Sequence, residues 1–106
     1  MPTIAPQAGA KRTATLLGAR RHRIGQIAVY RGDPSWVFMN IEGSTYEGKA
    51  VCRIQADNGA TVASGAFEVD NGSGQFARAF RVDIKTLRSA EIITPLGTVV
   101  ATALFS

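Results

Sequence analysis

Much of this sequence alternates between apolar and polar residues with a period of two, and short runs rich in Gly, Asn, Asp and Pro interrupt the alternation. Such alternation puts successive side chains on opposite faces of an extended strand, so it predicts antiparallel β-strands. Seven strands are predicted, at residues 24–31, 35–42, 49–56, 61–69, 75–82, 88–94 and 98–105. No helix is predicted, which favours an all-β fold.

Two architectures fit seven short antiparallel strands in a chain of 106 residues. An immunoglobulin-like antiparallel β-sandwich is favoured, and a small barrel is the alternative. The Cys-Trp-Cys spacing of antibody domains is missing, so the sandwich is predicted as an architecture without common descent from those domains.

The strand at 35–42 is apolar on both faces. Trp36 and Phe38 lie on one side, and Val37, Met39 and Ile41 lie on the other. Strands that are apolar on both sides are usually covered on both sides. We therefore expect a central strand in which Trp36 is a buried anchor of the core.

The strongest turn signal is Asp57-Asn58-Gly59, between the strands at 49–56 and 61–69. An Asn-Gly pair accepts the positive φ angles of a two-residue type I′ turn, so a tight hairpin is expected here. A second sharp break is expected at 70–74.

Positive charge is concentrated at the N-terminus. The chain has 12 basic and 8 acidic residues, and residues 1–23 hold five of the basic residues and none of the acidic ones. We expect residues 1–23 to be a flexible basic tail or linker and residues 24–106 to be the β-sandwich domain. Within this tail, Arg20, Arg21 and Arg23 are candidates for contact with polyanions such as nucleic acid.

Residues for catalysis are scarce. The single histidine, His22, lies in the predicted tail among arginines, and the single cysteine, Cys52, lies in an alternating apolar stretch that indicates a buried thiol. The acidic residues are scattered at strand ends and turns, where carboxylates commonly bond the local backbone. We expect no catalytic residue, no metal site and no cofactor, and therefore no enzyme.

The tripeptide Arg31-Gly32-Asp33 occurs in some cell-adhesion ligands, but here it ends a predicted strand and precedes Pro34. Glycine, aspartate and proline are ordinary turn residues, so a corner between two strands explains the tripeptide. Loops at the ends of β-sandwiches often make contacts with partners. The predicted interaction loops comprise Asp33, Pro34, Asn58, Gly59, Asn71, Gly72 and Ser73.

Several motifs between residues 24 and 105 together resemble a known family. They are Arg31-Gly32-Asp33-Pro34-Ser35-Trp36-Val37-Phe38-Met39, then Gly43, Tyr46 and Cys52, then Asp57-Asn58-Gly59, Gly65-Ala66-Phe67 and Asn71-Gly72-Ser73-Gly74, and finally Gly97-Thr98-Val99-Val100-Ala101-Thr102-Ala103. This succession resembles the C-terminal extracytoplasmic β-rich domain of actinobacterial anti-sigma-factor-like membrane proteins of the anti-sigma-K type. In that family a membrane helix and a sigma-binding segment, often with a zinc-binding His-Cys-Cys pattern, precede this domain, and this sequence has neither.

The resemblance implies a non-enzymatic sensor or protein-interaction module of an envelope-associated bacterial regulatory protein, with an unidentified protein partner. It implies a location on the extracytoplasmic face of a membrane, reached through an anchor outside this sequence; without the resemblance, the cytoplasm is expected. The alternative is a small nucleic-acid-binding protein that uses its basic N-terminal arm. An exposed edge strand such as 75–82 could also pair across a dimer.

Overall fold

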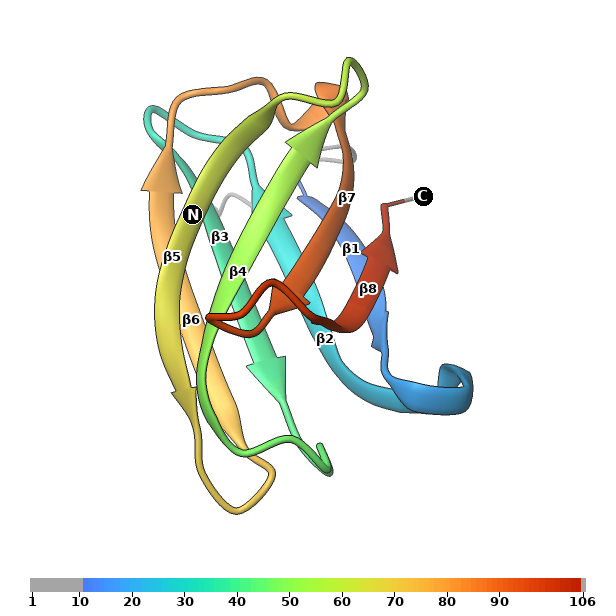
Figure 1. Ribbon diagram of the computed structural model, residues 1–106. Helices are drawn as coiled ribbons and strands as arrows, with labels where there is room; N and C mark the ends of the chain where they lie inside the picture. Colours follow the sequence, from blue (N-terminus) through green and yellow to red (C-terminus); the bar gives the residue numbers. More distant parts are fainter. Residues whose placement is uncertain (1–10, 106) are drawn as a thin grey trace.

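The computed structural model describes residues 11–105, which form an all-β fold of antiparallel strands (Figure 1). The strands are β1 Lys11–Leu17, β2 Arg23–Tyr30, β3 Ser35–Ile41, β4 Gly48–Ala56, β5 Thr61–Val69, β6 Gly74–Phe80, β7 Leu87–Ile93 and β8 Val99–Leu104. Two single-turn 3-10 helices, η1 Ala19–Arg21 and η2 Ile84–Thr86, connect β1 to β2 and β6 to β7. Within residues 11–105, no helix has the length and apolar character needed to cross a bilayer.

All eight strands belong to one nearly closed sheet, in the order β5-β4-β7-β8-β1-β2-β3-β6. The sheet has two four-stranded halves that face each other, with β5, β4, β7 and β8 in front of β6, β3, β2 and β1 in Figure 1. A single residue pair, Leu17 with Thr102, joins the two halves between β1 and β8. The predicted antiparallel all-β class is confirmed, whereas the immunoglobulin-like sandwich and the count of seven strands are not confirmed.

The sequence prediction of seven strands missed β1, which lies in the segment that we expected to be a flexible tail. Six consecutive residues from Lys11 to Leu16 pair with β2, and Ala14 and Leu16 point into the core. The Arg12 guanidinium extends inward as well, and its Nη1 donates to the carbonyl oxygens of Ile84 at 2.7 Å and Leu87 at 2.9 Å. The predicted domain start at residue 24 is therefore wrong, because the sheet already includes Lys11; residues 1–10 lie outside the described part.

The core lies between the two halves and is built from the inward-facing row of each strand. Its fully buried side chains include Leu16 from β1, Ile27 from β2, Met39 from β3, Ile54 from β4 and Ile92 from β7. Because the strand period is two, the alternate residues face outward along most of each strand; at the start of β2 a register shift opposite Leu16 and Leu17 turns Ile24 into the core. Only one face of each strand is thus needed to stabilise the fold.

The sheet closes between β5 and β6 through side chains. A Cβ atom at Gly65 on β5 would lie 2.5 Å from Cε1 of Phe76 on β6, so the glycine lets the ring pack directly on the backbone. The Nη1 of Arg78 donates to the carbonyl oxygen of Ser64 at 2.6 Å across the same seam. Strand β6 is terminal in the sheet order, so the edge strand expected at 75–82 is present at Gly74–Phe80.

The turn before β5 differs from the sequence prediction, whereas the sharp break expected at 70–74 is present as a tight turn between β5 and β6. Between β4 and β5, Gly59 alone among the loop residues has a positive φ, at 86°, and Ala56 N–H donates to Ala60 O at 2.9 Å. This is a longer hairpin loop rather than the expected two-residue type I′ turn. Positive φ at two successive central residues occurs instead between β5 and β6, at Asn71 (54°) and Gly72 (80°).

We expect Leu16→Ala to lower the free energy of unfolding by about 2–5 kcal/mol, because it deletes a fully buried side chain from β1. The matched control is Leu104→Ala, which truncates a leucine that is 70% exposed on β8 and should change stability by about 0.5 kcal/mol or less. Chemical denaturation measures both changes. Equal stabilities of the two variants would contradict the placement of β1 in the sheet.

A candidate binding surface on strands β1 to β3

Three aromatic side chains lie close together on the outer face of the sheet. Trp36 is 50% exposed, Phe38 46% and Tyr30 42%, and they are the only aromatic side chains among the large exposed hydrophobic residues within residues 11–105. Val37, Met39 and Ile41 fill the core from the opposite face of β3. The prediction that Trp36 is a buried anchor is therefore wrong, because β3 is covered on one side only.

The strand register places the aromatic residues directly beside one another. Tyr30 on β2 is the cross-strand partner of Trp36 on β3, and Lys11 on β1 is the partner of Tyr30. The Lys11 ammonium nitrogen lies 6.0 Å from the centroid of the Tyr30 ring, close enough for a cation–π attraction. One end of the surface is therefore a row of a cation and two aromatic rings.

Small residues surround these rings. Ala28 is the partner of Phe38 on β2, and Ala77 and Ala79 on β6 are the partners of Phe38 and Trp36. Cross-strand aromatic neighbours by themselves stabilise a sheet. A methyl group covers little of a neighbouring ring, however, so about half of each aromatic side chain stays accessible to a ligand.

Farther along the same strands, amide side chains replace the aromatic ones. Gln26 on β2 pairs with Asn40 on β3, which pairs with Gln75 on β6. Beyond them, the Oε2 of Glu42 accepts from Asn40 Nδ2 at 3.5 Å, and Asp33 is the carboxylate at the other, aromatic end. We call this surface the aromatic face, and a shallow groove on it is lined by Lys11, Thr13, Gln26, Ala28, Tyr30, Phe38 and Asn40.

Charge differs sharply between the two halves of the sheet. Residues 11–42 and 74–82, which form β1, β2, β3 and β6 with their connections, contain eight basic and two acidic residues. The remaining residues, 43–73 and 83–106, contain four basic and six acidic residues. The half that carries the aromatic face is thus strongly cationic, and the other half is weakly anionic.

Five exposed cations of this half form no ion pair with an acidic residue in the described part of the chain. Within residues 11–105 the structure contains two ion pairs, Arg53 with Glu91 at 2.6 Å and Arg81 with Asp33 at 3.1 Å. Lys11 and Arg31 lie at the aromatic end of the surface, and neither takes part in an ion pair there. The arginines that were predicted to contact polyanions lie at the other end, beyond the amides. These are Arg20, Arg21 and Arg23, all exposed.

The turn between β1 and β2 holds two of these arginines in an unusual conformation. Arg20 and Arg21 both have positive φ, at 56° and 59°, and His22 N–H donates back to Ala19 O at 3.1 Å. Two central residues with positive φ define a type I′ turn, which Asn-Gly adopts far more easily than bulky residues. The backbone thus has a local conformational cost at a position that exposes two guanidinium groups.

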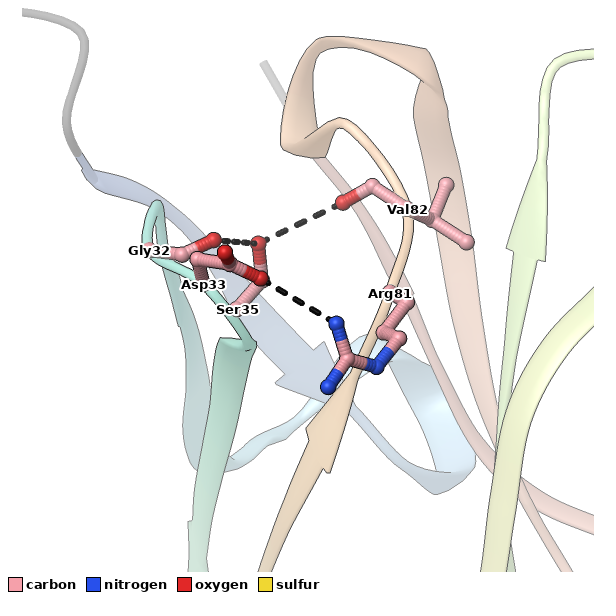
Figure 2. Close-up of polar contacts among 5 residues, drawn as sticks. All are labelled: Gly32, Asp33, Ser35, Arg81 and Val82. Carbon is pink, nitrogen blue, oxygen red and sulfur yellow. Dashed lines mark hydrogen bonds and ion pairs between the residues drawn. The ribbon is translucent and has the colours of Figure 1, made fainter.

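Asp33 and Pro34 lie in the corner between β2 and β3, and Figure 2 shows Asp33 there. Arg81 reaches Asp33 from the end of β6, and the Ser35 hydroxyl lies 3.4 Å from the carbonyl oxygens of both Gly32 and Val82. The Asp33 carboxylate is engaged within the chain, as expected for a turn that fastens two strands.

The predicted interaction loops do not form one site. The corner at Asp33 contacts the segment around residues 81–82, and Asp57, beside Asn58 and Gly59, donates its N–H to Thr86 O at 2.8 Å, so both loops lie at one end of the sheet (Figure 1). The loop of Asn71, Gly72 and Ser73 lies at the opposite end, where Gly72 O accepts from Ser44 N–H at 3.1 Å.

The residues with catalytic potential lie apart from this surface. Cys52 is buried in the core, where desolvation raises the pKa of its thiol to about 12. His22 is exposed beside the β1–β2 turn. No group of three or more His, Cys, Asp or Glu residues in the described part of the chain is arranged to hold a metal ion. What the surface can do is bind a ligand through stacking, amide hydrogen bonds and charge.

No protein-family model, no curated protein and no solved structure matches this chain in the comparisons. The candidate surface therefore rests on its geometry alone.

We expect the Cys52 thiol to react with a disulfide reagent at about pH 8 far more slowly in the native protein than in guanidinium, because the thiolate is the reactive form. Ionisation of the unfolded thiol near pH 9 also predicts falling stability between about pH 9 and 12, since the folded pKa is the higher one. Absorbance of the released thiolate follows the reaction. Equally fast reaction of native and unfolded protein would contradict the burial of Cys52.

Proposed function

We propose that this protein is a non-enzymatic binding module whose ligand lies across the aromatic face. The observation that carries the proposal is the row of Tyr30, Trp36 and Phe38, half-exposed side by side and not required by the core. Exposed apolar groups gathered on one surface, with polar groups around them, are typical of binding sites.

Two further features support a binding surface over a purely structural one. Amide side chains on neighbouring strands, Gln26 and Asn40, can both donate and accept hydrogen bonds and so orient a ligand. Regular strands also position these side chains more rigidly than loops would.

The finer parts of the sequence prediction stay predictions. The role in an envelope-associated regulatory protein with a protein partner rests on the family resemblance alone. An immunoglobulin-like sandwich remains our proposal for the architecture, supported by two four-stranded halves that face each other and are joined by one residue pair. The adhesion role of Arg31-Gly32-Asp33 is not tested by the contact between Asp33 and Arg81, because both side chains are largely exposed and such surface ion pairs are weak.

Trp36 is the only tryptophan of the chain, so its fluorescence reports directly on the proposed surface. We expect a saturable change in emission when the protein is titrated with at least one of three probes: a single-stranded oligonucleotide, a chito-oligosaccharide and an unstructured acidic peptide. Phe38→Ala should weaken that binding about tenfold, because each stacked aromatic contributes on the order of 1–3 kcal/mol.

The matched control for that titration is Leu104→Ala, which removes an exposed apolar side chain from the other half of the sheet. It should bind like the unmodified protein. No response to any of the three probes, or equal affinity of the Phe38 and Leu104 variants, would argue against the aromatic face as a binding site.

A further inference from the structure

We infer that the ligand of the aromatic face is a single-stranded nucleic acid. Its bases stack on Trp36, Phe38 and Tyr30, and its phosphates lie against the cations at the two ends of the face. The inference rests on the proposed function and names the ligand class.

Stacking favours a single strand over a duplex. The exposed rings project from the regular surface of a sheet, where successive bases of an extended strand can reach them. Bases in a duplex already stack on one another, whereas unpaired bases offer a free π-face to aromatic side chains.

Charge favours a polyanion over a neutral ligand. Lys11 and Arg31 flank the aromatic row, and Arg20, Arg21 and Arg23 lie past the amide row at the other end of β1 and β2. Among residues 11–105 none of the five takes part in an ion pair. A single-stranded nucleic acid that lies along β2 therefore meets cations before and after the aromatic rings, and these cations can bind its phosphates.

The amide row supplies hydrogen bonds of the kind that base edges need. Gln26, Asn40 and Gln75 follow the rings along three neighbouring strands. Each amide has a donor and an acceptor, and nucleobases present both kinds of group.

The β1–β2 turn with Arg20 and Arg21, which we call the arginine turn, is an independent sign that cations are needed at the end of the face beyond the amides. Arg20 and Arg21 occupy the two positive-φ positions of the β1–β2 turn, where Asn and Gly would cost less backbone energy. Strained backbone conformations concentrate at functional positions. A turn retained for folding alone would not need two arginines.

Other ligand classes use only part of the surface. A neutral glycan would stack on the rings but leave the flanking cations without partners. An acidic peptide would engage the cations but has no need of three exposed aromatic rings. A single-stranded nucleic acid uses the rings, the amides and the cations together. The experiment below also detects binding of a glycan or an acidic peptide.

The test is fluorescence anisotropy of labelled oligothymidine and oligouridine of about 12 nucleotides, titrated with the full chain at about 50 and 200 mM salt. Saturable binding of at least one is expected, and the two arms separate DNA from RNA. Trp36→Ala should weaken binding about tenfold or more at both salt concentrations. Lys11→Gln should reduce the slope of log affinity against log salt by about one.

Two control variants change exposed residues that lie outside the aromatic face. Leu104→Ala removes an exposed apolar side chain, and Lys85→Gln removes an exposed cation from the anionic half of the sheet. Both should bind like the unmodified chain. Circular dichroism and denaturation verify that every variant is folded.

Ligand controls keep the test decisive even where a variant is poorly folded. An oligonucleotide of the same length without bases should bind the unmodified chain more weakly than oligothymidine binds Trp36→Ala, because it loses stacking on all three rings. Trp36→Ala should not weaken binding of the baseless ligand further. Polyglutamate of similar charge should bind weakly. Equal binding of polyglutamate, of the baseless strand or of a duplex would overturn the inference.

The arginine turn gives a variant in which stability and binding should move in opposite directions. Replacing the pair by Arg20→Asn and Arg21→Gly should raise the melting temperature, because the new residues suit the type I′ turn, and should weaken oligonucleotide binding with a smaller salt slope. Unchanged oligonucleotide affinity in this variant would count against the role of the turn and so against the inference as stated.

The failures of the two proposals are distinguishable. If the chito-oligosaccharide or the peptide changes Trp36 emission and the oligonucleotides do not bind, the aromatic face remains a binding site and the nucleic-acid inference is wrong. If Trp36-dependent self-association of the chain appears by sedimentation and no oligonucleotide binds, a second copy is the occupant and the inference is likewise wrong. If no probe binds, both proposals fail.

Discussion

Each strand of this protein buries one row of side chains between the two halves of the sheet and leaves the alternate row outside, because the pleat repeats every two residues. Leu16, Ile27 and Met39 are fully buried in this way, so the inner rows carry the hydrophobic stabilisation. Shifting any strand by one residue would expose its whole apolar row. The inner rows thus fix the register, and the register in turn fixes which side chains stand next to each other outside.

The outer rows are free of this constraint, so what they contain calls for a different explanation. On the half formed by β1, β2, β3 and β6, the outer rows hold aromatic rings, amides and a lysine in adjacent positions, within a region of eight basic and two acidic residues. The turn at Arg20 and Arg21 adds a backbone conformation that is unfavourable for arginine. Cross-strand pairing stabilises part of the aromatic row, but it requires neither rings that are half exposed nor a positive-φ turn built from two arginines. The proposed recognition of a strand with bases and phosphates accounts for both.

The sequence was sufficient to predict all seven strands after residue 23, because their alternation is regular. It failed for β1, whose inward row begins with Arg12; only the structure shows that carbonyl oxygens of Ile84 and Leu87 accept from this guanidinium. It also failed for Trp36, since alternation says which residues share a face and not which face is covered. Apolar residues on both sides of β3 fit either burial of both faces or exposure of one aromatic face, and the alternation alone does not distinguish the two.

The most direct test of the central claim is a two-dimensional amide NMR titration of the full chain with oligothymidine of about 12 nucleotides. If a single strand binds the aromatic face, shift changes should concentrate on β1, β2 and β3 around Lys11, Tyr30, Trp36 and Phe38, with a second group at the β1–β2 turn. Shift changes confined to the loops at residues 57–60 and 71–73, or to the half formed by β4, β5, β7 and β8, would contradict it.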